Sequence, residues 1–112
     1  MVILFLITKM VKCVLISEDP GNVSEIETPL KGNDIFRILK GPPTFIGQIE
    51  DIVIMKCESS QFDLMENRNV VPTVDEIVFG PILLVKMNEN SEPEDLTIDE
   101  WMTFLPFKGQ TF

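Results

Sequence analysis

The acid–base chemistry open to this chain is limited to carboxylates, because it contains no histidine. Without histidine there can be no Ser-His-Asp triad, no Cys-His pair and no imidazole ligand for a metal. Glu50 and Asp51 are adjacent carboxylates, but adjacent side chains on a strand point to opposite faces, so we do not expect a catalytic pair. Gly41 and Gly47 match neither a P-loop nor a dinucleotide fingerprint. These residues predict a protein that is not an enzyme and binds no cofactor.

The segment from Asn88 to Asp95 carries oxygen ligands at alternate positions, as part of a calcium loop does. However, Pro93 stands where an EF-hand needs glycine, and the twelfth position would be Asp99 rather than glutamate. The segment therefore predicts a solvated acidic loop that leads into a helix, and no metal site.

Cys13 and Cys57 are the two cysteines of the chain, too few for a disulfide framework. Both lie in apolar, β-rich runs, which is typical of buried thiols. No cluster of basic residues lies nearby in the sequence to activate either thiol. We therefore expect an intracellular, reducing compartment, while a Cys13–Cys57 bridge stays open if the two strands are neighbours.

The remaining candidate residues have side chains that could bind another molecule rather than catalyse a reaction. Arg68, between Asn67 and Asn69 in a predicted loop, could bind an anion, or it could be exposed or locally paired. Trp101 either packs its helix onto a sheet or anchors an interface. With the aromatic residues of the two ends and of the loop after Gly41, the predicted interaction residues are Phe5, Phe45, Arg68, Trp101, Phe107 and Phe112.

The elements that would position these residues are strands and two short helices. Runs rich in Val and Ile predict strands at 10–17, 23–28 and 51–58, the second at an edge and the third in the centre. A short strand at 61–65 is also considered, and the apolar run 76–87 is interrupted by Gly80-Pro81, which marks a bulge, a strand start or an edge.

Helix signals occur twice. Asn33 is a predicted N-cap, and the helix it begins ends at Lys40, with Gly41 as the C′ residue before two prolines. The capping box Thr97–Glu100 begins a second helix, which Pro106 ends. Together the elements predict an α+β fold, with a mostly antiparallel sheet of about four to six strands and two short helices packed on it.

The predicted organisation is a single domain with two apolar ends. Residues 1–9 form an apolar arm or an extra strand, 10–106 the domain and 107–112 a C-terminal tail. The apolar run Met1–Thr8 lacks a basic region before it and is too short to span a bilayer, so we predict no membrane span. Either Met1 or Met10 could be the natural start.

The charge balance is strongly acidic, with 18 acidic and 9 basic residues and a net charge of −9. This composition argues against direct binding to a nucleic-acid backbone or to an anionic membrane. It favours a basic protein partner or self-association, or it only keeps the domain soluble.

From Lys12 onward the chain resembles a family of small uncharacterised proteins of large algal DNA viruses and microalgae. The resemblance covers about nine-tenths of the chain and is carried by the blocks Leu39–Gln48, Ile52–Cys57, Gly80–Pro93 and Asp95–Trp101. No activity is carried over. The resemblance implies a viral or algal origin, an accessory or particle-associated role, and the host cytoplasm or virus particle as compartment.

The leading hypothesis is a non-enzymatic protein–protein interaction module, a minor structural or accessory protein of a large DNA virus. It would bind through the apolar arm, the loop from Gly41 to Gly47 and the C-terminal tail. The first alternative is an acidic regulator that binds a basic partner or mimics nucleic acid, which requires residues 17–27 and 88–100 to lie on one face. The second is a small hydrolase or transferase built on carboxylates and Arg68, which requires a deep pocket that joins Arg68 to several carboxylates.

Overall fold

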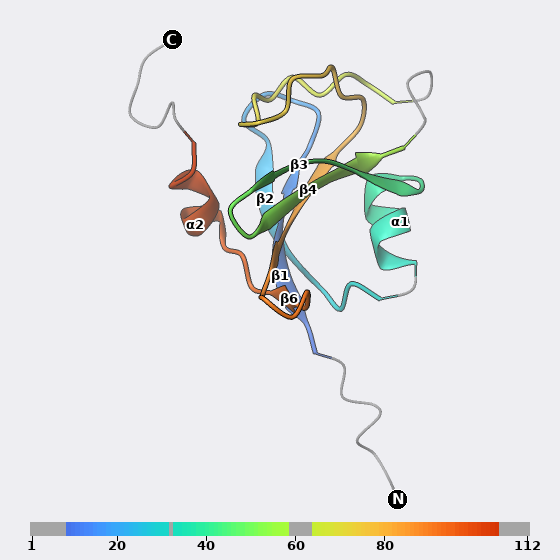
Figure 1. Cartoon of the computed structure of the whole chain (residues 1–112). Helices are drawn as coiled ribbons and strands as arrows, with labels where there is room; N and C mark the ends of the chain where they lie inside the picture. The colour runs from blue at the N-terminus through green and yellow to red at the C-terminus, as the bar shows by residue number, and fades with distance from the viewer. Residues whose placement is uncertain (1–8, 32, 59–63, 106–112) are drawn as a thin grey trace, which may run out of the picture.

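The structure is a computed structural model, and it describes residues 9–31, 33–58 and 64–105 (Figure 1). Within these residues, six strands form one sheet and two short helices pack against it, which confirms the α+β prediction. The elements are β1 (Val11–Ile16), β2 (Val23–Thr28), α1 (Asp34–Leu39), β3 (Pro43–Ile49), β4 (Ile52–Cys57), β5 (Ile82–Met87), β6 (Pro93–Glu94) and α2 (Ile98–Met102).

The sheet has the strand order β2-β1-β5-β4-β3, with every neighbouring pair antiparallel. The late strand β5 inserts between β1 and β4, where Leu84 faces Val14 on one side and Ile54 on the other. Four consecutive buried residues, Ile82 to Val85, suit this central place because both faces of the sheet are covered there. The short β6 pairs with the end of β5, and β2 lies at the edge as predicted.

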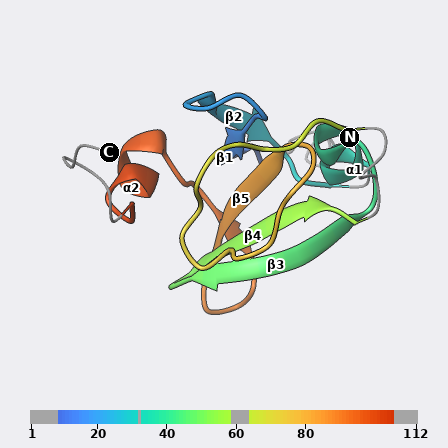
Figure 2. The ribbon, with the colours of Figure 1, turned by 90° about the horizontal axis from the view of Figure 1, so that it is seen from above.

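The two faces of the sheet carry separate apolar clusters because strand side chains alternate. On one face, Ile54 and Leu84 pack with Trp101 of α2 and with Val71 and Val78 of the segment 64–81. That segment crosses in front of β5 in Figure 2. The other face is covered by α1, so the two helices lie on opposite sides of the molecule (Figures 1 and 2).

That second cluster is smaller and is centred on Leu39 of α1. Cys13, Met55 and Leu83 belong to it, one from each of three neighbouring strands. The helix therefore covers the part of this face over β1, β5 and β4 rather than the whole of it.

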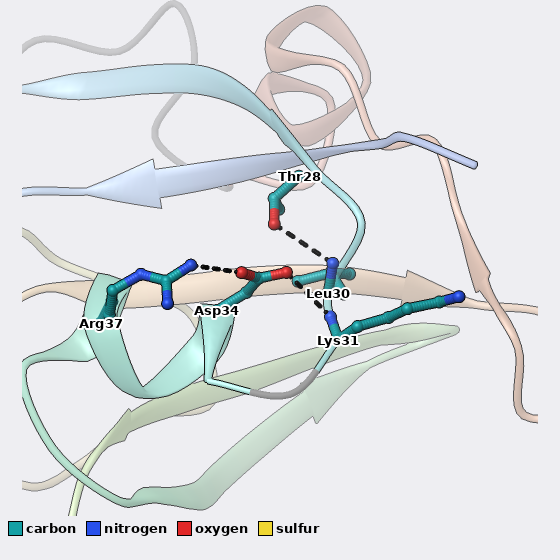
Figure 3. A network of polar contacts seen from close by, with 5 residues as sticks. All are labelled: Thr28, Leu30, Lys31, Asp34 and Arg37. Carbon is teal, nitrogen blue, oxygen red and sulfur yellow. Dashed lines mark hydrogen bonds and ion pairs between the residues drawn. The ribbon is translucent and has the colours of Figure 1, made fainter. Parts of the chain in front are cut away.

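The start of α1 differs from the prediction in one detail. Asn33 occupies the N-cap position, but its side chain makes no capping hydrogen bond. Instead, Asp34 accepts a hydrogen bond from the Lys31 backbone N–H at 3.0 Å and pairs with Arg37 one turn later (Figure 3). At the other end, the left-handed conformation belongs to Lys40 (φ 66°) rather than to Gly41.

The predicted capping box of α2 is half formed. The Thr97 hydroxyl accepts a hydrogen bond from the Glu100 backbone N–H at 3.1 Å, as expected. The Glu100 carboxylate does not return to the cap; it accepts a hydrogen bond from Lys86 Nζ at 2.8 Å. This contact ties α2 to the central strand β5.

Two predictions about the middle of the chain were wrong or fall partly outside the described residues. The expected loop from Gly41 to Gly47 is largely β3, which pairs with β4 and carries a bulge between Phe45 and Gly47. Of the possible strand at 61–65, Leu64 and Met65 are not in a strand, and 61–63 lie outside the described residues.

Candidate functional site

The face of the sheet that carries α1 is hollowed where the helix does not reach. A broad open groove of about 870 Å³ lies there, and we call it the acidic groove. Its apolar floor comes from three neighbouring strands and consists of Phe45, Val53 and Met87. Val53 and Met87 also pack against the cluster under α1, which places the groove beside the helix on the same face.

Phe45 is the most exposed part of this floor. Its side chain lies on the edge strand β3 and is 71% exposed. The register pairs Phe45 with Met55, whose own side chain is buried under α1. The bulge that follows Phe45 lets Ile46 and Ile49 pack into the opposite cluster, while the Phe45 ring stays on the groove side.

The acidic rim comes from two turns that are far apart in the sequence. Glu50 and Asp51 form the turn between β3 and β4, and Glu89 and Glu94 lie in and after the turn that ends β5. The two turns are adjacent because the Met87 backbone N–H donates to the Asp51 carbonyl at 2.8 Å. The sequence argument that placed Glu50 and Asp51 on opposite faces was wrong, since both lie in a turn and line the groove.

The second of these turns is held in shape by one amide. Asn88 Oδ1 accepts hydrogen bonds from the backbone N–H groups of Asn90 (2.8 Å) and Glu92 (2.9 Å). The amide oxygen that a calcium loop would offer to a cation is therefore used inside the turn. Among the described residues, no group of three or more acidic or cysteine side chains is arranged to hold a metal ion.

The charged side chains that line the groove in the described structure are acidic. Among the lining residues that the structure describes, four are carboxylates and none is a lysine or an arginine. Lys86 is not a lining residue, and its ammonium bonds to Glu100 on the other face of the sheet. That hydrogen bond raises the pKa of Lys86, and the charges of Asp51 and Glu94 at the rim raise it further, so these two carboxylates are partly balanced by a cation. An apolar floor under carboxylates can hold the aliphatic stem of a lysine or arginine and pair with its charged end.

The loop that contains Arg68 has a structural role. The side chains of Asn67 and Asn69 bond to backbone groups of the strand β1 and its turn and of the loop before β5, at Ile16, Ser17, Asp19, Gly21 and Gly80. Arg68 itself is exposed and lines a pocket with Glu18, Asp19 and Glu66. Because acidic groups surround it, this arrangement favours local pairing over anion binding.

The remaining predicted interaction residues fall into two groups. Trp101 is 1% exposed and lies in the core with its ring 6.3 Å from that of Phe104, so it packs the helix rather than offering a surface. Phe5, Phe107 and Phe112 lie outside the described residues, as do residues 1–8 of the predicted arm and the whole predicted tail.

The cysteines are both buried and are not joined by a disulfide. Burial raises the pKa of the Cys13 thiol to about 11, so this thiol is protonated at neutral pH. Cys57 lies under α1, with its sulfur 3.7 Å from the Lys40 carbonyl oxygen. Both positions suit packing rather than nucleophilic chemistry.

Comparison with known proteins gives one match. The model of a family of unknown function (DUF5880) matches residues 14–104. The chain belongs to this family. No curated protein and no solved structure matches the chain.

The DUF5880 match begins inside β1 and ends just after α2, so it includes the whole acidic groove and the Asn67–Asn69 loop. The expected membership of an uncharacterised family is confirmed. In the part of the DUF5880 chain that the structure describes, no helix has the length and apolar character to cross a bilayer.

Proposed function

We propose that this protein is a non-enzymatic interaction module that binds a basic, partly apolar segment of a partner protein in the acidic groove. One observation carries the proposal: a phenylalanine that is 71% exposed stands on a groove whose described lining includes four carboxylates and no lysine or arginine. Aromatic residues, phenylalanine included, are enriched in the cores of protein–protein interfaces.

The physical basis is a combination of steering and burial. The four carboxylates and the net charge of −9 would attract a basic segment, and they would repel nucleic acid and acidic proteins. Once bound, a lysine or arginine can place its stem on Val53 and Met87 and its charge over the Phe45 ring. The floor supplies affinity and the rim supplies specificity.

An accessory or minor structural role in a large DNA virus is the biological setting that we propose, with the host cytoplasm or the particle as compartment. It is supported by the resemblance of the blocks from Leu39 onward to proteins of such viruses. Two buried, unbridged cysteines are compatible with a reducing compartment.

The test is peptide binding followed by fluorescence anisotropy. A labelled peptide of alternating lysine and leucine should bind the full chain, and its glutamate–leucine counterpart should not. Raising the salt concentration should weaken the binding. The double variant Asp51→Lys/Glu89→Lys reverses two exposed rim charges and should lower the affinity at least tenfold.

The matched control is Glu27→Lys/Asp75→Lys, which makes the same change in net charge at two exposed positions outside the groove. It should lower the affinity no more than about threefold. Equal losses in the two variants would mean that net charge alone attracts the peptide, and the groove would have no specific role.

A further inference from the structure

The helix beside the groove has an outer surface of opposite character. Phe36 and Arg37 are exposed on α1, and the residues that flank the helix, Asn33 and Lys40, are exposed at its two ends, so the four residues make up the outer surface of the helix. We call it the α1 stripe. Phe36 is 50% exposed, although the other apolar side chains of the helix turn inward toward the cluster that contains Leu39.

The charges of this helix complement those of the groove. Lys31, Arg37 and Lys40 are exposed around α1. Asp34 pairs with Arg37, but the Arg37 side chain remains 69% exposed, and the Lys31 side chain extends away from the pair (Figure 3). The helix thus offers an aromatic ring with cations, and the groove offers an aromatic ring with carboxylates.

The positions of the two surfaces also complement each other. Both lie on the same face of the sheet, because Val53 and Met87 of the groove floor also pack against the cluster under α1. The helix forms a raised layer over one part of this face (Figure 1). A helix is about 10 Å wide, so the face has the profile of a step. Two such steps fit together when one is turned about a two-fold axis, as in an isologous dimer.

We propose that the partner of the acidic groove is α1 of a second copy of this chain. Two copies bind face to face, and each places its α1 stripe in the groove of the other. Phe36 of one copy then lies near Phe45 of the other, and Lys31, Arg37 and Lys40 face Glu50, Asp51, Glu89 and Glu94. This inference rests on the proposed function of the groove and names its occupant.

A charge-swap experiment tests the dimer. The groove variant is Asp51→Lys/Glu89→Lys, and the helix variant is Lys31→Glu/Lys40→Glu, which leaves the Asp34–Arg37 pair in place. The mass of the full chain is measured by light scattering over a range of concentrations. The wild-type chain should dimerise, and each variant alone should dimerise at least tenfold more weakly.

An equimolar mixture of the two variants should restore the dimer, because both reciprocal contacts again join opposite charges. The control mixture pairs the helix variant with Glu27→Lys/Asp75→Lys, whose own groove and helix are unchanged and which should dimerise with itself. The mean mass should not exceed the value given by those homodimers plus a monomeric helix variant, since a mixed dimer still has one contact that joins like charges. Recovery in the first mixture also shows that both variants are folded.

Two results would overturn the dimer. One is a wild-type chain that stays monomeric up to millimolar concentration, and the other is association that neither variant weakens. If that monomer still binds the lysine–leucine peptide, the groove keeps its proposed function and only its assigned occupant is wrong. If it does not, the proposed function fails as well.

Discussion

Asn69 donates hydrogen bonds from its backbone N–H and from its side-chain amide to Asn67 Oδ1, each at 3.1 Å. Asn67 in turn donates from its own amide to the carbonyl oxygens of Ile16 (3.1 Å) and Gly80 (2.9 Å). Asn67 is buried, so these bonds are shielded from water. The pair closes the segment 64–81 onto β1, and this explains why two amides flank Arg68.

Replacing Asn67 should therefore destabilise the fold. Asn67→Ala leaves the two carbonyl oxygens and the Asn69 donors without their partner, which should cost about 2–3 kcal/mol in the free energy of unfolding. Asn67→Asp should cost at least as much, since a carboxylate would face two carbonyl oxygens. Urea denaturation measures both.

The control for this prediction is Asn90→Ala, at an exposed position in the turn after β5. It should change the free energy of unfolding by less than about 0.5 kcal/mol. Similar losses at the two positions would contradict the structural role that we assign to Asn67.

The contact between Gly41 and Cys57 sets a second prediction. A Cβ atom built on Gly41 would overlap with Cys57 Sγ, because the chain after α1 passes directly over β4. Gly41→Ala should cost about 1–3 kcal/mol through overpacking. Combined with Cys57→Ala, it should cost about 1 kcal/mol less than the sum of the single variants. The free energies of unfolding of the single and double variants are measured by thermal or urea denaturation. Additive losses in this double-mutant cycle would show that the two residues do not touch.

The buried thiol of Cys13 predicts a loss of stability at alkaline pH. Its pKa is raised from 9.0 to about 11 in the folded chain, so between these values the folded state binds the proton that the unfolded state has released. Stability from this group is complete below pH 9 and falls as the pH rises toward 11, by about 2–3 kcal/mol for two pKa units.

Urea denaturation at pH 8, 9, 10 and 11 checks this prediction against Cys13→Val, which has a similar volume and no titrating group. The variant should lose less stability than the wild type across this range. Parallel curves for the two proteins would mean that Cys13 does not titrate as its burial implies.

Much of the fold could be predicted because local patterns and packing agree. The hairpin at Pro20-Gly21, the strand starting after Pro81 and the Thr97 cap follow their sequence signals. The strand β3 was missed because it begins with Pro43, contains Gly47 and carries a bulge that interrupts the alternation. Proline, glycine and broken alternation indicate a loop in a sequence, and only the pairing with β4 shows that the segment is a strand.

The acidic groove could not be predicted from the sequence, although Phe45 was named. Its carboxylates come from two turns about forty residues apart, and they meet only because β4 and β5 pair with Ile52 opposite Lys86. Nothing local in either turn signals that pairing. The uncovered part of the sheet could not be predicted either. It exists because α1 has only six residues and covers only part of the face formed by three strands.

The most direct test of the central claim is a map of backbone amide chemical shifts in the full chain during titration with the lysine–leucine peptide. Our account predicts that the changes concentrate at residues 45–53 and 87–94, and that Phe45→Ser weakens them at least fivefold. Changes concentrated instead at the exposed residues Val70 and Met102, or no changes at all, would contradict the acidic groove as the binding surface.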